Sequence, residues 1–187
     1  MTGFEFLFSF YGLLLGLAVA NVATSFADMW RDRNATPVGV APPLLGLFIL
    51  LAAAEQWASF WGARDALTME PWEMLTSMGM ALPYIFVSQG MFPREQRGWA
   101  SLEAYYLAHS RVLMAVLTIP PLVSLGYNLA FNPYGRALPA AEYIAYLAGD
   151  YGLRLVVPGA LLVFRRLWVH RVGIAVLCAL TLYELFA

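Results

Sequence analysis

Three charged residues, Glu55, Asp150 and Arg154, lie within stretches of this chain that are otherwise apolar. A charge in the hydrocarbon of a membrane is costly, so such residues usually face protein or water, have a partner and often take part in function. Asp150 and Arg154 are four residues apart, which predicts an ion pair on one helix face. The pair leaves one acid unneutralised, and we expect Glu55 to be held in its protonated form by burial. Such a polar centre is typical of a proton or cation pathway.

Two tyrosines extend this polar stripe along the same helix. Tyr146 and Tyr143 precede Asp150 by one and two turns. At the rise of an α-helix, Asp150 is about 15 Å and Glu55 about 10 Å from the nearer ends of their helices, so the two acids lie at comparable depth. The alternative is a structural ion pair that fixes the register of the helices, and the sequence leaves both roles open.

The composition is that of a membrane protein. Hydrophobic residues make up 61% of the 187 residues and charged residues 12%, whereas a soluble domain is about half apolar and a quarter charged. The net charge of −1 provides no basic surface for a nucleic acid. All eleven basic residues are arginine, which excludes a lysine Schiff base.

Six stretches are apolar and long enough to cross a bilayer as helices, which takes about 20 residues. Short connections join them. We therefore predict an all-α integral membrane protein in which residues 1–187 form a single domain of six transmembrane helices. The six stretches are Phe4–Phe26, Pro43–Gly62, Trp72–Phe92, Leu107–Phe131, Ala141–Phe164 and Trp168–Phe186.

The arginines alternate between rich and poor connections. The second and fourth connections hold only Arg64 and Arg136. The richer connections are expected on the cytoplasmic side, so both termini are predicted to be periplasmic. The first, third and fifth connections hold Arg31, Arg33, Arg94, Arg97, Arg165, Arg166 and Arg171.

Prolines predict kinks in the third to fifth helices. Pro120 and Pro121 are adjacent and lie near the middle of the fourth stretch, where they must break or bend the helix. Pro83 and Pro158 lie within the third and fifth stretches. Broken helices often build transport sites, and the alternative is a kink that serves only packing.

Small residues mark one face of the first stretch. Gly12, Gly16 and Ala20 recur every four positions, which lets another helix approach closely. This predicted packing face serves either a contact within the chain or a contact with a second molecule.

No catalytic motif is found. His109 and His170 are expected at the cytoplasmic edge of the membrane, not buried within helices, which disfavours haem. No histidine spacing typical of zinc and no nucleophile elbow occurs. We therefore predict no enzyme, no metal and no cofactor.

Two hypotheses for function remain. The preferred one is a small channel or transporter for a proton, ion or small solute, with Glu55, Asp150 and Arg154 as its centre. The rival is an accessory or scaffold subunit of a larger membrane complex. Partners are the lipid bilayer and either a second copy or another membrane protein. The stretches Phe10–Ala20 and Gln56–Trp61 resemble small bacterial inner-membrane proteins, which implies a multi-pass protein of that membrane and no particular mechanism.

Overall fold

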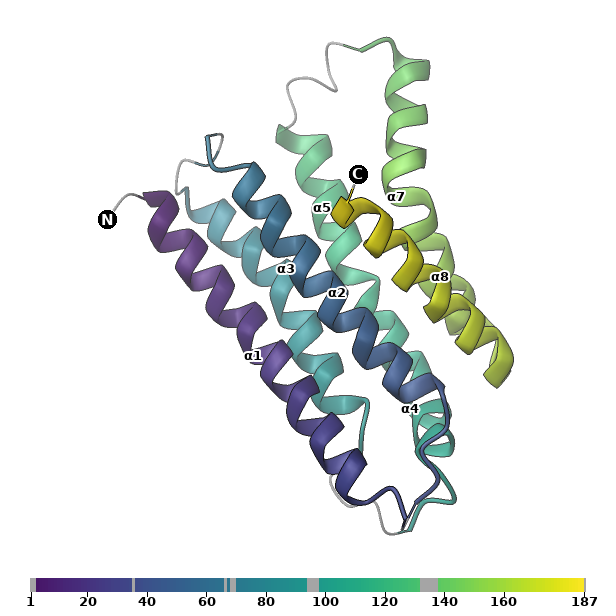
Figure 1. Cartoon of the computed structure of the whole chain (residues 1–187). Helices are drawn as coiled ribbons and strands as arrows, with labels where there is room; N and C mark the ends of the chain where they lie inside the picture. The colour runs from purple at the N-terminus through teal and green to yellow at the C-terminus, as the bar shows by residue number, and fades with distance from the viewer. Residues whose placement is uncertain are drawn as a thin grey trace.

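The computed structural model describes residues 3–34, 36–65, 67, 70–93, 98–131 and 138–186. These residues form helices and connections and contain no strand, which confirms the predicted all-α fold (Figure 1). Arg94, Arg97 and Arg136, which contribute to the predicted orientation, lie outside the described residues. The helices are α1 (Gly3–Arg31), α2 (Ala41–Gly62), α3 (Pro71–Gly90), α4 (Leu102–Leu117), α5 (Ile119–Phe131), α7 (Ala140–Val163) and α8 (Leu167–Phe186).

Five helical stretches are long and apolar enough to cross a membrane: α1, α2, the stretch Leu102–Phe131 formed by α4 and α5 together, α7 and α8. The protein is therefore a multi-pass membrane protein. Figure 1 shows both chain ends toward the end of the bundle that carries the α2–α3 and α5–α7 connections. The predicted total of six crossings and their orientation stay predictions, because α3 is not among these five stretches.

Local sequence explains where several helices begin. Pro42 lies in the first turn of α2, where its missing N–H costs nothing. In α3, Glu70 and Glu73 form a capping box. The side chain of Ser101 accepts a hydrogen bond from Ala104 N at the start of α4.

The predicted break in the fourth apolar stretch is present. Thr118 interrupts the helix between α4 and α5, because Pro120 and Pro121 have no N–H to donate to the preceding turn. Pro83 and Pro158 lie inside α3 and α7, which remain helical through them. The bends predicted at these two single prolines stay predictions.

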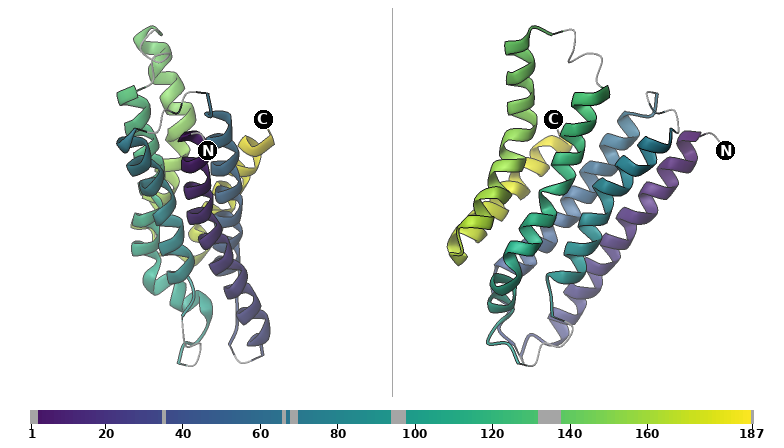
Figure 2. Two further views of the ribbon diagram at one scale, coloured as in Figure 1. Left: turned by 90° about the vertical axis from the view of Figure 1, so that its left-hand side faces the viewer. Right: turned by 180° about the vertical axis from the view of Figure 1, so that it is seen from behind.

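Two groups of helices pack against each other. α1, α2 and α3 run side by side, with α1 contacting both α2 and α3, as Figures 1 and 2 show. α8 packs on α2, and α7 packs on α4, α5 and α8. The core between them is apolar and fully or almost fully buried, and it includes Leu15, Leu45, Ile49, Val87, Leu113, Met114 and Ile174.

A polar contact joins α2, α4 and α8 at the other end of the bundle. Glu103 accepts hydrogen bonds from the N–H groups of Val40 and Ala41 at the start of α2, over 2.8 and 3.1 Å. The guanidinium of Arg171 binds the same carboxylate through two bonds of 3.0 and 2.8 Å. Gly39 has a φ of +72°, and a Cβ there would lie 2.2 Å from Glu103 Cδ, so only glycine fits.

His170 in the first turn of α8 is fully buried beside this contact, so the expectation that it is not buried is wrong, whereas its place at the cytoplasmic edge stays a prediction. Its Nδ1 lies 2.7 Å from the hydroxyl of Tyr106, and its Nε2 lies 2.9 Å from the carbonyl oxygen of Phe164. Both ring nitrogens therefore have partners. The burial of His170 could not be predicted from the local sequence, because its partner Tyr106 lies on another helix.

Within the described residues, no helix of this chain packs closely on the small-residue face of α1 at Gly16. α1 instead buries Leu7, Tyr11, Leu15, Ala18 and Val22. A Cβ added at Gly12 would lie 3.6 Å from Trp57, and one added at Gly16 would meet no atom within 4 Å. Gly16 and Ala20 are exposed. The alternative of a contact with a second molecule stays a prediction.

Candidate functional site

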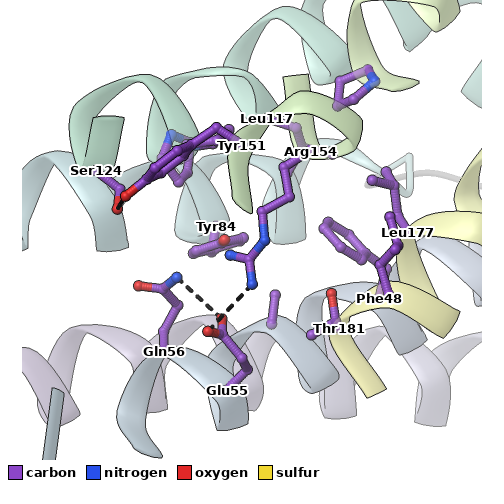
Figure 3. Close-up of a pocket in the computed structure, with 15 residues that line it drawn as sticks. Phe48, Glu55, Gln56, Tyr84, Leu117, Ser124, Tyr151, Arg154, Leu177 and Thr181 are labelled. Atoms are coloured by element: carbon purple, nitrogen blue, oxygen red, sulfur yellow. Dashed lines mark hydrogen bonds and ion pairs between the residues drawn. The ribbon is translucent and has the colours of Figure 1, made fainter. Parts of the chain in front are cut away.

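Arg154 of α7 is the centre of a partly buried ionic cluster. Its Nε donates a hydrogen bond of 3.2 Å to Oε1 of Glu184, and its Nη2 contacts Oε2 of the same carboxylate. Its Nη2 also lies 3.5 Å from Oε1 of Glu55 (Figure 3). Three helices, α2, α7 and α8, therefore supply two carboxylates and one guanidinium, with a net charge of −1 when all are ionised.

Asp150 takes no part in this cluster, so the predicted pair between Asp150 and Arg154 is wrong. In the described chain Arg154 pairs with Glu55 and Glu184, and Asp150 is exposed. The physical reason is competition. A pair four residues apart on one helix contributes only about 0.5 kcal/mol, whereas Arg154 between two other carboxylates gains a charge-assisted hydrogen bond to Glu184 and an ion pair with Glu55.

Glu55 is surrounded by hydrogen-bond donors. Ser59 donates its hydroxyl to Oε1 over 3.0 Å, and the side-chain amide of Gln56 donates to Oε2 over 3.2 Å. The hydroxyl of Tyr11 on α1 donates in turn to Gln56 over 2.9 Å. The expectation that Glu55 lacks an oppositely charged partner is therefore wrong, and its contacts suit an ionised carboxylate.

A small cavity of about 40 Å³ lies beside the cluster. Its polar walls are the side chains of Glu55, Gln56, Tyr84, Ser124, Tyr151, Arg154 and Thr181. A water occupies about 30 Å³ in the liquid, and a cavity that admits one needs several polar partners, which these walls provide. The cavity is thus large enough to hold water.

The broken fourth stretch contributes to the same cavity. Pro120, Pro121 and Leu117 all line it. Because Pro121 has no N–H, the carbonyl of Leu117 loses the donor that a regular helix would supply. The helix break predicted from sequence therefore lies beside the ionic cluster.

A larger pocket adjoins this cavity toward the α2–α3 connection. Its volume is about 250 Å³, and Leu67 of that connection forms part of its wall. Gln56 and Ser124 line both spaces. The two side chains therefore stand between the larger pocket and the cavity beside Arg154.

The opposite direction is closed by apolar side chains. Phe48, Leu117 and Leu177 line the cavity on that side of the cluster. Leu45 and Ile49 follow along α2 and are fully buried. The described lining on this side of the cluster is therefore apolar, whereas the side toward the α2–α3 end carries the polar side chains of Gln56 and Ser124.

The two predicted tyrosines bind an asparagine on α5. Tyr143 donates its hydroxyl to Oδ1 of Asn128 over 3.1 Å, and Asn128 Nδ2 donates to Tyr146 over 3.2 Å. About one turn away, the hydroxyl of Tyr151, which follows Tyr146 in α7, lies 3.3 Å from that of Ser124, which precedes Asn128 in α5. These groups extend the polar lining along α5 and α7 without touching Arg154.

Sequence reasoning missed Glu184, Gln56 and Tyr11. Glu184 lies near the end of the last apolar stretch, where a carboxylate is ordinarily assigned to the membrane surface. The available signal was an acid within the last turn of a helix that is otherwise apolar. Gln56 follows Glu55 directly, and Tyr11 carried no sequence signal because its partner lies on another helix.

Comparisons with known proteins give no family assignment. No family model, no curated protein and no solved structure matches the sequence. Within the described residues, no three or more His, Cys, Asp or Glu side chains are grouped to hold a metal ion.

Proposed function

We propose that this protein is a small channel or transporter that moves protons, or another small ion, through the cluster of Glu55, Arg154 and Glu184. The observation that carries the proposal is the pairing of one guanidinium with two carboxylates beside a water-sized cavity. One carboxylate exceeds the positive charge, so the cluster can take up a proton and become neutral without losing its ion pair.

The size of the cavity favours a proton over a larger solute. A space of about 40 Å³ accepts water, through which a proton can be relayed, but not an organic substrate. The apolar side chains around Leu177 are a reason to propose a transporter in one closed conformation rather than an open pore. The interruption at Thr118 next to the cavity is a suitable place for the helix to move.

The proposed location is a bacterial inner membrane, with both termini in the periplasm. The support is the alternation of arginines between connections. In this orientation the larger pocket near Leu67 opens to the periplasm. Protons would then enter the cluster from the outer side.

A scaffold subunit is the second candidate function. An apolar groove of about 610 Å³ lies on α1 and α2, and Gly12, Gly16 and Trp57 line it. A groove lined by glycines suits close approach of another transmembrane helix. In this case the ionic cluster would only hold α2, α7 and α8 together.

Proton flux into vesicles separates these candidates. The protein is reconstituted in vesicles that contain a pH-sensitive dye, and a potassium gradient with valinomycin supplies the driving potential. We expect flux above that of empty vesicles, and a decrease of at least tenfold for Glu55→Gln and for Glu184→Gln. Glu142→Gln is the matched control, because Glu142 is an exposed acid in the first turn of α7.

The proton flux through the unmodified protein distinguishes the two functions. Flux no greater than that of empty vesicles would favour the scaffold. Flux that persists unchanged in both cluster variants would show that the ionic cluster is not the pathway.

A further inference from the structure

The pocket of about 250 Å³ near the α2–α3 connection has the chemistry of a ligand site that is separate from the ionic cluster. It lies between α2, α3 and α5, and Leu67 contributes to its wall. Its volume corresponds to about eight waters in the liquid. It is therefore large enough for a small organic molecule, unlike the cavity beside Arg154.

The walls of this pocket are chiefly apolar and are held in place by their neighbours. The ring of Phe60 stacks on Tyr11 with centroids 4.6 Å apart. The ring of Tyr127 lies 5.4 Å from that of Trp72. Because both rings are already packed, a ligand meets formed aromatic surfaces and loses little free energy in ordering them.

The polar groups of the pocket favour a positive charge. Glu73 is only 3% exposed and contributes a carboxylate to the lining. The hydroxyls of Ser59, Thr76 and Ser77 line the same space, and no arginine is among the described residues that form the pocket. The excess carboxylate of the neighbouring Arg154 cluster adds to this negative field.

We propose that this pocket binds a small organic cation, an ammonium group attached to an apolar or aromatic body. The ammonium group would lie between the carboxylate of Glu73 and the faces of Phe60 and Tyr127, where carboxylate and aromatic rings both attract a cation. The apolar body would fill the rest of the pocket and contact its apolar walls, including Met80. The site does not depend on transport, because binding needs no movement of the closed inner half.

Binding of benzyltrimethylammonium to the full-length protein tests the proposal. The protein is placed in phosphatidylglycerol nanodiscs, and binding is measured by isothermal titration calorimetry. We expect saturable binding that is at least tenfold tighter than that of neutral neopentylbenzene or benzyl alcohol. Equal affinity for the neutral and charged probes, or no saturable binding, would overturn the proposal.

Three variants locate the site. Glu73→Gln keeps the capping box of α3, because glutamine also serves at that position, and we expect it to weaken binding at least tenfold. Ala63→Leu narrows the pocket from an exposed position without changing any charge, and we expect a similar loss. The control Glu142→Gln removes an acid far along the sequence and outside the pocket lining, and should bind like the parent.

The outcome has a clear reading even if one variant is unstable. Size-exclusion profiles and thermal unfolding identify folded variants, and either Glu73→Gln or Ala63→Leu is sufficient. Unchanged binding in a folded Ala63→Leu protein would place the probe elsewhere and overturn the proposal. Flux and binding are measured separately, so a failure of proton transport leaves this result unaffected.

A lipid ammonium headgroup has the same chemistry as a soluble cation. Repeating the titration in phosphatidylethanolamine nanodiscs distinguishes the two sources. Weaker apparent binding there would assign the natural occupant to the lipid headgroup through competition. Equal binding in both nanodiscs would assign it to a soluble cation.

Discussion

Arg154 Nε donates a hydrogen bond of 3.2 Å to Oε1 of Glu184, which ties the middle of α7 to the last turn of α8. The two residues are 30 positions apart in the chain. Because the guanidinium also reaches Glu55 on α2, this contact fixes three helices relative to one another. The end of α8 is therefore part of the candidate site.

A double-mutant cycle should show that Arg154 and Glu184 are coupled. Arg154→Ala leaves the buried Glu55 and the partly buried Glu184 without their cation, which we expect to cost somewhat less than the roughly 3 kcal/mol of a fully buried pair. Glu184→Ala should cost less, because Glu55 still balances Arg154. The double variant should be more stable than the sum of the two losses predicts, by about 1 kcal/mol or more. Reversible unfolding in detergent measures these differences.

Asp150→Ala is the matched control for this cycle. Asp150 is exposed and lies one turn from Arg154 without pairing with it in the described chain. We expect its removal to change the free energy of unfolding by less than about 0.5 kcal/mol. A loss as large as that of Glu184→Ala would mean that Asp150, rather than Glu184, holds the arginine.

Leucine substitutions at two glycines should differ in their effect on the Tm. A Cβ at Gly46 would lie 2.6 Å from the ring of Phe26 and 3.3 Å from Val22, whereas one at Gly16 meets no atom within 4 Å. Gly46→Leu should therefore force α1 and α2 apart and lower the Tm by about 5 °C or more, and Gly16→Leu should change it little. If Gly16→Leu were the more damaging, α1 would have a partner on its small-residue face. Thermal unfolding together with the oligomeric state distinguishes these results.

Glu103 should be important for the start of α2. Glu103→Ala removes the acceptor for the N–H groups of Val40 and Ala41 and the partner of Arg171. We expect the Tm to fall by about 5 °C. Arg171→Ala should have a smaller effect, because Glu103 would still cap α2. Equal effects of the two variants would show that the ion pair, not the cap, is the stabilising contact.

The helices could be predicted because each one carries its own signal. A run such as that in α1 is apolar over a length that spans a bilayer, and the isolated backbone can satisfy its hydrogen bonds only as a helix. Pro120 and Pro121 likewise break the helix through their own covalent structure. These features depend on residues that are close together in the chain.

The partners of Arg154 could not be predicted in the same way. The choice between Asp150, Glu55 and Glu184 depends on how α7 is rotated and on which helices lie beside it. That rotation results from packing, such as the burial of Tyr151 and Pro158 on α7. The spacing of Asp150 and Arg154 showed only that a pair on one helix was feasible.

The orientation of the chain is open to a direct test. Both ends lie toward the end of the bundle that carries the α2–α3 connection, so the two termini should share one side of the membrane. The arginine alternation places that side in the periplasm. A C-terminal alkaline phosphatase fusion should therefore be active, and a C-terminal green fluorescent protein fusion exported by the general secretory route should be dark.

Cysteine labelling provides the independent check on this orientation. The natural Cys178 is buried, so an introduced cysteine at an exposed position should dominate labelling by a membrane-impermeant maleimide. Ala63→Cys lies at the α2–α3 end and should be labelled in spheroplasts, whereas Trp99→Cys lies in the α3–α4 connection and should react only after lysis. Both residues are exposed, so a difference between them reports the side of the membrane rather than burial. The reverse labelling pattern would show that the orientation is opposite to the one predicted, with the larger pocket near Leu67 on the cytoplasmic side.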